Sequence, residues 1–363
     1  MTWPTLWLIH GLITIKAKLD NKMIERFIKN DLSLKRWRSF KKRKLAVLSC
    51  VILFLMILGT LVAPMLANSK PLYLKYQGKS YYPVLKEYSP KEFGITDTMV
   101  INFREMKLST DDGMVWPLIK WDPFESNSKV TSYPAKPSKD NIWGTDDRGR
   151  DVFTRILYGF KYSIIYAVVV WLICTVVGIA AGGVMGFYGG RIDFYGQRLV
   201  EVLSTVPQFF LLLILISIFT PTLGWLIVVS CLFSWIGISY YVRGEFLKNR
   251  KKEFVEAARA LGASNSSIIF KHILPNSLIP VITFAPFSNA GHIVGLAGLD
   301  FLGFGLEIPT PSWGELLAQA QKNFTTAWWL ALYPSLALFV TLVLLNLIGE
   351  GVRDALDPRA GQS

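Results

Sequence analysis

The chain has 363 residues, of which 52% are hydrophobic, and its mean hydropathy is +0.36. These values exclude an ordinary soluble domain, because the apolar residues are gathered in long blocks. Lys and Arg number 39 against 26 Asp and Glu, which gives a formal net charge of +13. No nucleic-acid module accompanies the basic segments, so the charge favours membrane topology and attraction to anionic lipid of the bilayer.

The N-terminal segment, residues 1–44, is predicted to be basic and cytoplasmic, and it ends in Lys41-Lys42-Arg43-Lys44. Within it, Trp3–Ile15 is apolar but shorter than the roughly 20 residues that a membrane-spanning helix needs. We expect Met1–Asn21 to be either an interfacial helix or a start-site artefact, because Met23 would begin an ordinary basic N-terminus.

Six apolar runs are predicted to cross the membrane. They must be helices, because no backbone polar group can stay unpaired in hydrocarbon. The six are Leu45–Leu66, Ser163–Phe187, Leu199–Phe219, Leu223–Val242, Asn276–Gly298 and Trp328–Ile348. Only the third contains any Asp, Glu, Lys or Arg, namely Glu201 near its start, from where the carboxylate can reach the interface. The predicted fold class is an all-α polytopic membrane protein with six transmembrane helices.

Charge predicts the orientation of these spans. The N-terminal segment and the loop Arg243–Lys271, with Arg250-Lys251-Lys252, are both basic and fall on the same side if all six spans form. The positive-inside rule assigns that side to the cytoplasm. The C-terminal residues 353–363 then lie there as well.

A polar segment, residues 67–160, separates the first span from the second and is extracytoplasmic in this topology. It is too long for a linker. Its Tyr-rich alternating runs predict short strands at Lys70–Tyr76 and Tyr81–Val84. We therefore expect a small β-containing domain or an elaborated loop. Asp151 is a candidate N-cap for the helix that follows.

The loop before the fifth span has a specific build. It contains Glu256-Ala257-Ala258, then Gly262, and later Leu274-Pro275. This pattern favours a short helix, a bend at the glycine and a second helix. The two alanines would let the backbone of another protein approach closely. An amphipathic helix that binds only lipid headgroups is the alternative interpretation.

This loop resembles the ATPase-docking loop of ABC importer permeases. The residues Glu256, Ala257, Ala258, Gly262, Leu274 and Pro275 are in register with its signature, and His272 stands where isoleucine is usual. Three more segments resemble the dipeptide and oligopeptide permeases, in the family's order. They are Gly144–Asp151, the pair Leu299–Gly305 and Pro309–Glu315, and Gly349–Pro358. The insert, with Tyr81-Tyr82-Pro83, is similar to that of the second permease of importers for microcin C and oligopeptides.

The resemblance implies a type I ABC importer permease fold over residues 161–352, in a bacterial inner membrane. It implies a heterodimer with a second permease, and two ATPase domains docked on the loop 243–275. It also implies an extracytoplasmic peptide-binding protein that delivers the cargo. ATP and Mg would bind the ATPase, and this chain would carry no cofactor.

Few residues of the sequence suit a nucleotide-binding, metal-binding or catalytic site. Gly78-Lys79-Ser80 lacks the first glycine of a phosphate-binding loop, since Tyr73 stands there. The cysteines Cys50, Cys174 and Cys231 lie in predicted spans and suit small apolar core positions better than disulfides or metal ligands. His292 could face a transport pathway or be a packed, hydrogen-bonded residue. An ATP-independent carrier or channel stays the alternative function, while a membrane-embedded hydrolase lacks a nucleophile–base pair.

Overall fold

The computed structural model describes residues 30–95, 101–106, 108–219 and 221–357. The predictions for Met1–Asn21 and for the last residues of the C-terminus lie outside these ranges. Within them, five helices are long and apolar enough to cross a membrane, and a bent pair of helices would make a sixth span. The predicted fold class of a helical, multi-pass membrane protein is thereby confirmed.

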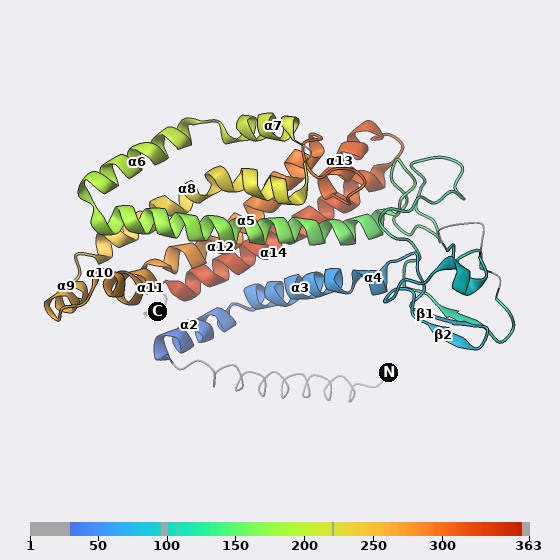
Figure 1. Cartoon of the computed structure of the whole chain (residues 1–363), viewed down its shortest axis with the longest axis horizontal. Helices are drawn as coiled ribbons and strands as arrows, with labels where there is room; N and C mark the ends of the chain where they lie inside the picture. The colour runs from blue at the N-terminus through green and yellow to red at the C-terminus, as the bar shows by residue number, and fades with distance from the viewer. Residues whose placement is uncertain (1–29, 96–100, 107, 220, 358–363) are drawn as a thin grey trace.

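The helix α5, Val152–Tyr188, forms the spine of the bundle (Figure 1). It begins eleven residues before the predicted span, because the Asp151 side chain accepts a hydrogen bond from the Thr154 backbone N–H (2.9 Å) and caps it. Along one side it packs on α8, Leu223–Asn249.

Glycines bring α5 and α8 into close contact. Gly178, Gly182 and Gly186 follow one another at intervals of four residues and therefore share a face of α5. A Cβ placed on Gly182 would lie 2.4 Å from the Ser239 carbonyl oxygen, and one on Gly186 would lie 2.7 Å from that of Arg243. Small residues at such spacing let membrane helices approach until their backbones touch.

The other long helices complete the bundle. They are α3 (Lys44–Leu61), α12 (Ile279–Phe301) and α14 (Trp328–Leu356), with α14 packed between α3 and α12. Shorter helices flank them: α2 (Asp31–Lys42), α4 (Ala63–Leu66) and α13 (Trp313–Lys322). A core centred on Phe160, Trp313 and Trp329 joins α5, α13 and α14.

The predicted third span, Leu199–Phe219, is not one helix. It is divided between α6 (Gly190–Thr205) and α7 (Gln208–Ile218), which meet at 71°. Pro207 lies at the break. It has no N–H to continue α6, and its ring forces Val206 out of the helical region, to ψ 125°.

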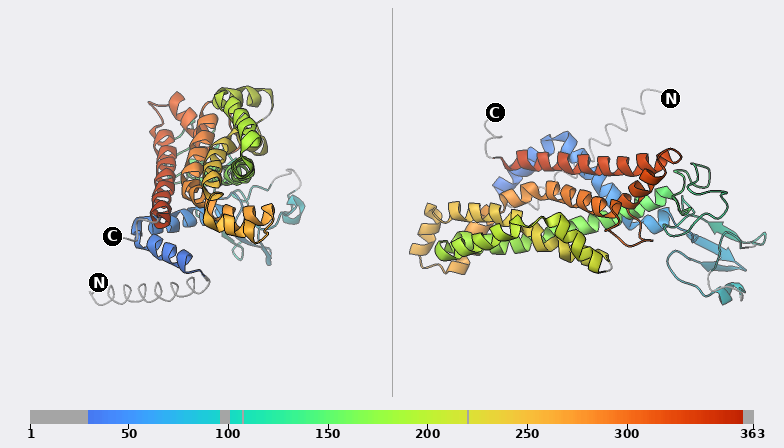
Figure 2. Two further views of the ribbon diagram at one scale, coloured as in Figure 1. Left: turned by 90° about the vertical axis from the view of Figure 1, so that its left-hand side faces the viewer. Right: turned by 90° about the horizontal axis from the view of Figure 1, so that it is seen from above.

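The insert contains the predicted small sheet. Its strands are β1 (Tyr73–Tyr76), β2 (Lys79–Tyr81) and β3 (Gly113–Val115), all antiparallel in the order β2-β1-β3. Gln77 and Gly78, both with positive φ, form the two-residue hairpin turn between β1 and β2. The second strand was predicted at Tyr81–Val84 but ends at Tyr81, because Pro83 cannot donate to the sheet. Figure 2 shows the insert projecting from one end of the helical bundle.

Candidate functional site

The loop between α8 and α12 lies at the end of the bundle opposite the insert (Figure 1). It contains α9 (Glu253–Ala260), α10 (Asn265–Ser267), the π-helix η2 (Ile268–Ile273) and α11 (Leu274–Ser277). The sequence-predicted site residues are thus spread over two arms that meet at a bend. The segment 265–277 leads from the bend into α12.

Gly262 makes the bend. Its φ is +79°, a conformation that side chains with a Cβ rarely adopt. The Gly262 N–H donates to the Arg259 carbonyl (2.9 Å) and the Ala263 N–H donates to the Ala258 carbonyl (3.0 Å). These two bonds are the Schellman arrangement, which ends a helix by satisfying its last carbonyls. The predicted helix, bend and second helix are therefore present.

One face of the loop packs on this chain's own helices. Val255, Ile268 and Ile273 are fully buried against Phe187 of α5 and Phe246 of α8. Below them, Asn249 at the end of α8 donates a hydrogen bond to the Ser277 hydroxyl (3.1 Å). The loop is therefore attached to the ends of the membrane helices and would move with them.

The other face of α9 is open. Glu256, Ala257 and Gly262 are exposed, and so is Pro275 on α11, whereas Leu274 is half-buried. Leu261 at the bend is 88% exposed. Ala258, however, is only 8% exposed and packs inward. Of the two alanines, Ala257 therefore lies on the open face, whereas the small side chain of Ala258 lets α9 lie close to its own chain.

Charged contacts tie the helix ends beside this loop to one another. Arg250, the residue after α8, donates to the Phe187 carbonyl (3.1 Å). Arg243 forms a two-pronged ion pair with Asp193 of α6, with Nη2 2.8 Å from Oδ2. The ends of α5, α6 and α8 are thus joined to one another by these hydrogen bonds and ion pairs.

The opposite end of the bundle holds a buried cluster of charges. Arg150 bonds Asp146 (Nε–Oδ2, 2.7 Å) and Glu315 of α13 (Nη2–Oε1, 3.0 Å). Arg155 of α5 also pairs with Glu315, and its Nε lies 3.3 Å from Asp146. Asp146 and Arg155 have no exposed side-chain surface, and Glu315 is 13% exposed. Such a cluster is stable only when each charge has its partners.

This cluster joins segments that are far apart in the sequence. The sequence patterns of segments 144–151 and 309–315 do not predict that Arg150, Arg155 and Glu315 meet. The nearby Trp329 indole of α14 donates a hydrogen bond to the Thr145 carbonyl (3.0 Å) and so connects α14 to the segment 144–151. Beside the cluster, burial and the adjacent Asp146 carboxylate raise the pKa of Asp147. The geometry of this end of the bundle therefore depends on both segments.

His292 lies on α12 and lines a cavity of about 300 Å³ between α5, α8 and α12. Its walls include Trp171 and the stacked pair Tyr241 and Phe284, whose ring centroids are 5.0 Å apart. Gly237 and Gly291 leave open space on two sides. His292 is thus at a cavity wall within α12 and outside the loop that holds the docking residues. Among the described residues, no group of three His, Cys, Asp or Glu side chains is placed to hold a metal ion.

The fold and these two ends define a multi-pass membrane protein with a structured loop at one end and a folded insert at the other. Residues 178–362 match the family model described as "Binding-protein-dependent transport system inner membrane component". Residues 35–83 match the model described as "N-terminal TM domain of oligopeptide transport permease C". The chain belongs to this family, as an oligopeptide-type permease of ABC transporters.

Individual relatives agree with this assignment. The chain is 39% identical to the inner membrane ABC transporter permease protein YejE of Escherichia coli (strain K12), over 89% of this chain and 96% of the relative. It is 35% identical to the peptidoglycan transport system permease protein YejE of Agrobacterium fabrum, over 90% and 92%. It is also 35% identical to the oligopeptide transport system permease protein OppC of Haemophilus influenzae, over 60% and 70%.

Family membership decides the question of catalysis. A permease of this family lacks the ATPase domain, so the chain is a transport subunit and not an enzyme. ATP binds the partner ATPase, and the permease carries no cofactor of its own. The transporter therefore contains at least an ATPase besides this chain.

Proposed function

We propose that this chain is one of two permease subunits of an ATP-driven peptide importer in the bacterial inner membrane. The second permease pairs with it through helix packing, and each permease receives one of two ATPase subunits. An extracytoplasmic binding protein delivers the peptide at the end that carries the insert. The loop between α8 and α12 and both chain termini then face the cytoplasm. The names of the relatives, which include oligopeptide and peptidoglycan transport systems, support the cargo class.

The observation that carries this proposal is the uncovered face of α9. Glu256, Ala257 and Leu261 are exposed together, while the reverse face is packed on helix ends. An exposed leucine beside a small residue and a charge suits a protein partner that approaches closely. Because α9 is attached to α5 and α8, movement of a docked ATPase would be passed to the membrane helices. ATP binding would in this way switch the pathway between inward-facing and outward-facing states.

Two substitutions test the docking role. Glu256→Lys reverses a charge on the open face, and Gly262→Pro cannot adopt the required φ of +79°. Both variants are expected to reduce peptide uptake by about tenfold or more, while the chain still inserts in the membrane. Uptake of a radiolabelled peptide at matched expression gives the readout.

A matched control separates docking from general charge effects. Asp111 is an exposed carboxylate in the insert, at the other end of the molecule, and Asp111→Lys should leave uptake unchanged. Wild-type uptake in both loop variants would refute the docking role and favour an ATP-independent carrier or channel.

We further propose that the cavity beside His292 belongs to the transport pathway. It is lined by three long membrane helices, and its aromatic rings and open glycine positions leave space for an apolar side chain of the cargo. His292→Ala should reduce uptake severalfold without changing co-purification of the ATPase, whereas His292→Gln, which keeps a hydrogen-bonding side chain, should retain more activity. Equal, wild-type uptake in both variants would make His292 a packing residue.

A further inference from the structure

The insert contains a second cavity, separate from the one beside His292. Its volume is about 350 Å³, and it is lined by ten residues. They are Arg104, Trp116, Leu118, Ile119, Lys120, Trp121, Lys129, Lys139, Asp140 and Ile142. Four of these are cationic and one is anionic. A cavity of this size is at the small end of ligand pockets and suits a headgroup or a small molecule.

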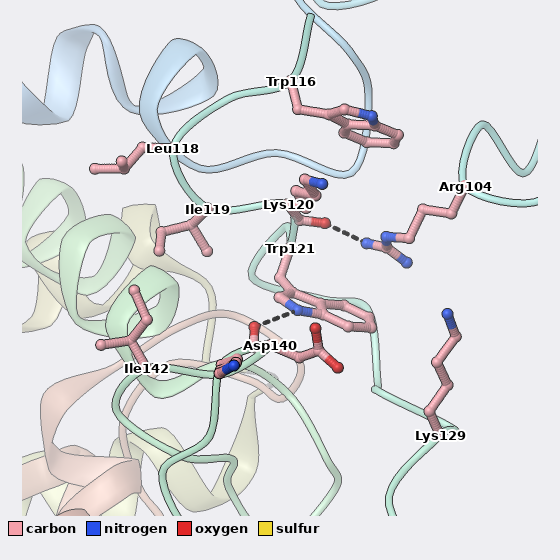
Figure 3. Close-up of a pocket in the computed structure, with 10 residues that line it drawn as sticks. Arg104, Trp116, Leu118, Ile119, Lys120, Trp121, Lys129, Asp140 and Ile142 are labelled. Carbon is pink, nitrogen blue, oxygen red and sulfur yellow. Dashed lines mark hydrogen bonds between the residues drawn. The ribbon is translucent and has the colours of Figure 1, made fainter. Parts of the chain in front are cut away.

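The floor of this pocket is rigid. The Arg104 guanidinium lies 3.8 Å from the centre of the Trp121 ring, and both of its terminal nitrogens bond Glu125. It also donates to the Lys120 carbonyl, and the Trp121 indole donates to the Asp140 carbonyl (2.9 Å), as Figure 3 shows. The Arg104 Nε is buried and has no hydrogen-bond partner within the described chain. Because this nitrogen has almost no accessible surface, Arg104 belongs to the floor of the pocket, where Glu125 compensates its charge.

The remaining cations are free to bind. Lys129 and Lys139 are exposed, and neither forms an ion pair with the parts of the chain that the structure describes. Lys120 lies 5.5 Å from the Trp116 ring centre. Because Glu125 neutralises Arg104, these three lysines determine the sign of the net charge of the pocket. With only Asp140 opposing them, they favour an anion.

The position of the pocket indicates which anion. The Ile119 N–H donates to the Leu66 carbonyl at the end of α4, so one wall is attached where the first span finishes. Next to Ile142, the Trp143 ring stacks on Tyr333 of α14 at 4.4 Å. The pocket therefore lies at the level where the membrane helices end, which is the depth of lipid headgroups. Trp and Lys together are typical of that depth.

The two sides of the pocket differ in polarity. Figure 3 shows Leu118, Ile119 and Ile142 on the side nearer the helices, with Arg104 and Lys129 on the far side. Leu118 is 77% exposed and Ile142 is 53% exposed, which is unusual for residues that line a charged pocket. A phospholipid has the same arrangement, with apolar chains toward the membrane and an anionic group beyond them. An acidic protein surface would not require the exposed apolar side.

We propose that this pocket binds the phosphate group of an anionic phospholipid at the membrane surface on the side of the insert. The lysines hold the phosphate, the tryptophans flank the headgroup, and Leu118 and Ile142 contact the acyl chains. A bound lipid would fasten the insert to the bilayer beside α3 and α5. The proposal does not depend on the cargo or on the ATPase.

Native mass spectrometry of the full-length protein, purified in mild detergent with any subunits that accompany it, tests the proposal. Dioleoylphosphatidylglycerol is titrated against the zwitterionic dioleoylphosphatidylcholine. The variant Lys129→Gln/Lys139→Gln removes two pocket charges, and Lys75→Gln/Lys79→Gln removes two exposed charges from the sheet of the same insert. Since each lysine contributes on the order of a few-fold in affinity for anionic lipid, the first variant should bind phosphatidylglycerol about tenfold more weakly. The second should bind as wild type does.

Three results would overturn the proposal. The first is equal binding of the two lipids, and the second is an equal loss in both double variants. The third is complete displacement of phosphatidylglycerol by millimolar inorganic phosphate or by a short oligoglutamate peptide, which would assign the pocket to a soluble anion or to an acidic protein partner.

Discussion

Glu315 shows how much one side chain can determine in this protein. It pairs with both Arg150 and Arg155, which are almost completely buried. Glu315→Gln would leave Asp146 as the single carboxylate for two arginines. Because an uncompensated buried charge is costly, we expect a loss of about 3 kcal/mol in stability. A lower midpoint of thermal unfolding in detergent would show it.

The control for this prediction is a pair at the surface. Glu87 lies 3.5 Å from Lys70, and its side chain is 94% exposed. Glu87→Gln should therefore leave the unfolding midpoint close to wild type, because exposed ion pairs contribute little. Equal midpoints for the two glutamine variants would contradict the structural role of the buried cluster.

Residue-scale prediction from sequence succeeded where backbone geometry alone decides. Gly262 was expected at a bend, and it occupies the left-handed position that ends α9. Ala257 and Ala258 could not be told apart, because which of two adjacent residues faces inward depends on how the helix is docked. Arg150, Arg155 and Glu315 were not predicted as a cluster, since their contact depends on tertiary packing across roughly 160 residues of chain.

At the scale of helices, the contact of α5 with α8 depends on glycine. Gly182→Ala adds a Cβ where the Ser239 carbonyl oxygen would be 2.4 Å away. The helices must then separate, at a cost of about 1–3 kcal/mol that exceeds the gain in helix propensity. We expect a lower unfolding midpoint in detergent and reduced yield from membranes.

A second glycine in the same pair of helices gives the opposite expectation. A Cβ on Gly244 of α8 would have no atom within 4 Å. Gly244→Ala should therefore be neutral or slightly stabilising, by up to about 1 kcal/mol from helix propensity. If both alanine variants were equally stable, close backbone contact would not be what joins α5 to α8.

Hydropathy located the elements more reliably than their ends or shapes. Five predicted spans correspond to helices, but α5 and α8 continue well beyond their apolar runs. Polar residues extend these helices where caps and packing support them, and a hydropathy pattern does not detect that support. The break at Pro207 was visible as a proline, but a hydropathy pattern contains no measure of the 71° angle between α6 and α7.

At the scale of the molecule, α9 lies at one end of the bundle and the insert at the other (Figure 1). The open face belongs to α9, and the basic pocket and the buried charge cluster lie at the end that carries the insert. The spans and the loop between α8 and α12 could be predicted from the sequence, because hydropathy and a local motif specify them. The pocket of the insert could not, since its residues come from loops without a regular pattern.

The proposed function requires that the exposed face of α9 binds an ATPase subunit. The first experiment is to place a photo-crosslinking amino acid at Ala257 and, as a control, at Asp111 of the insert. Irradiation of native membranes followed by mass spectrometry should yield a cross-link from Ala257 to a nucleotide-binding subunit and none from Asp111. Cross-links from Ala257 to lipid alone would contradict the account and make α9 a helix that lies on the membrane surface.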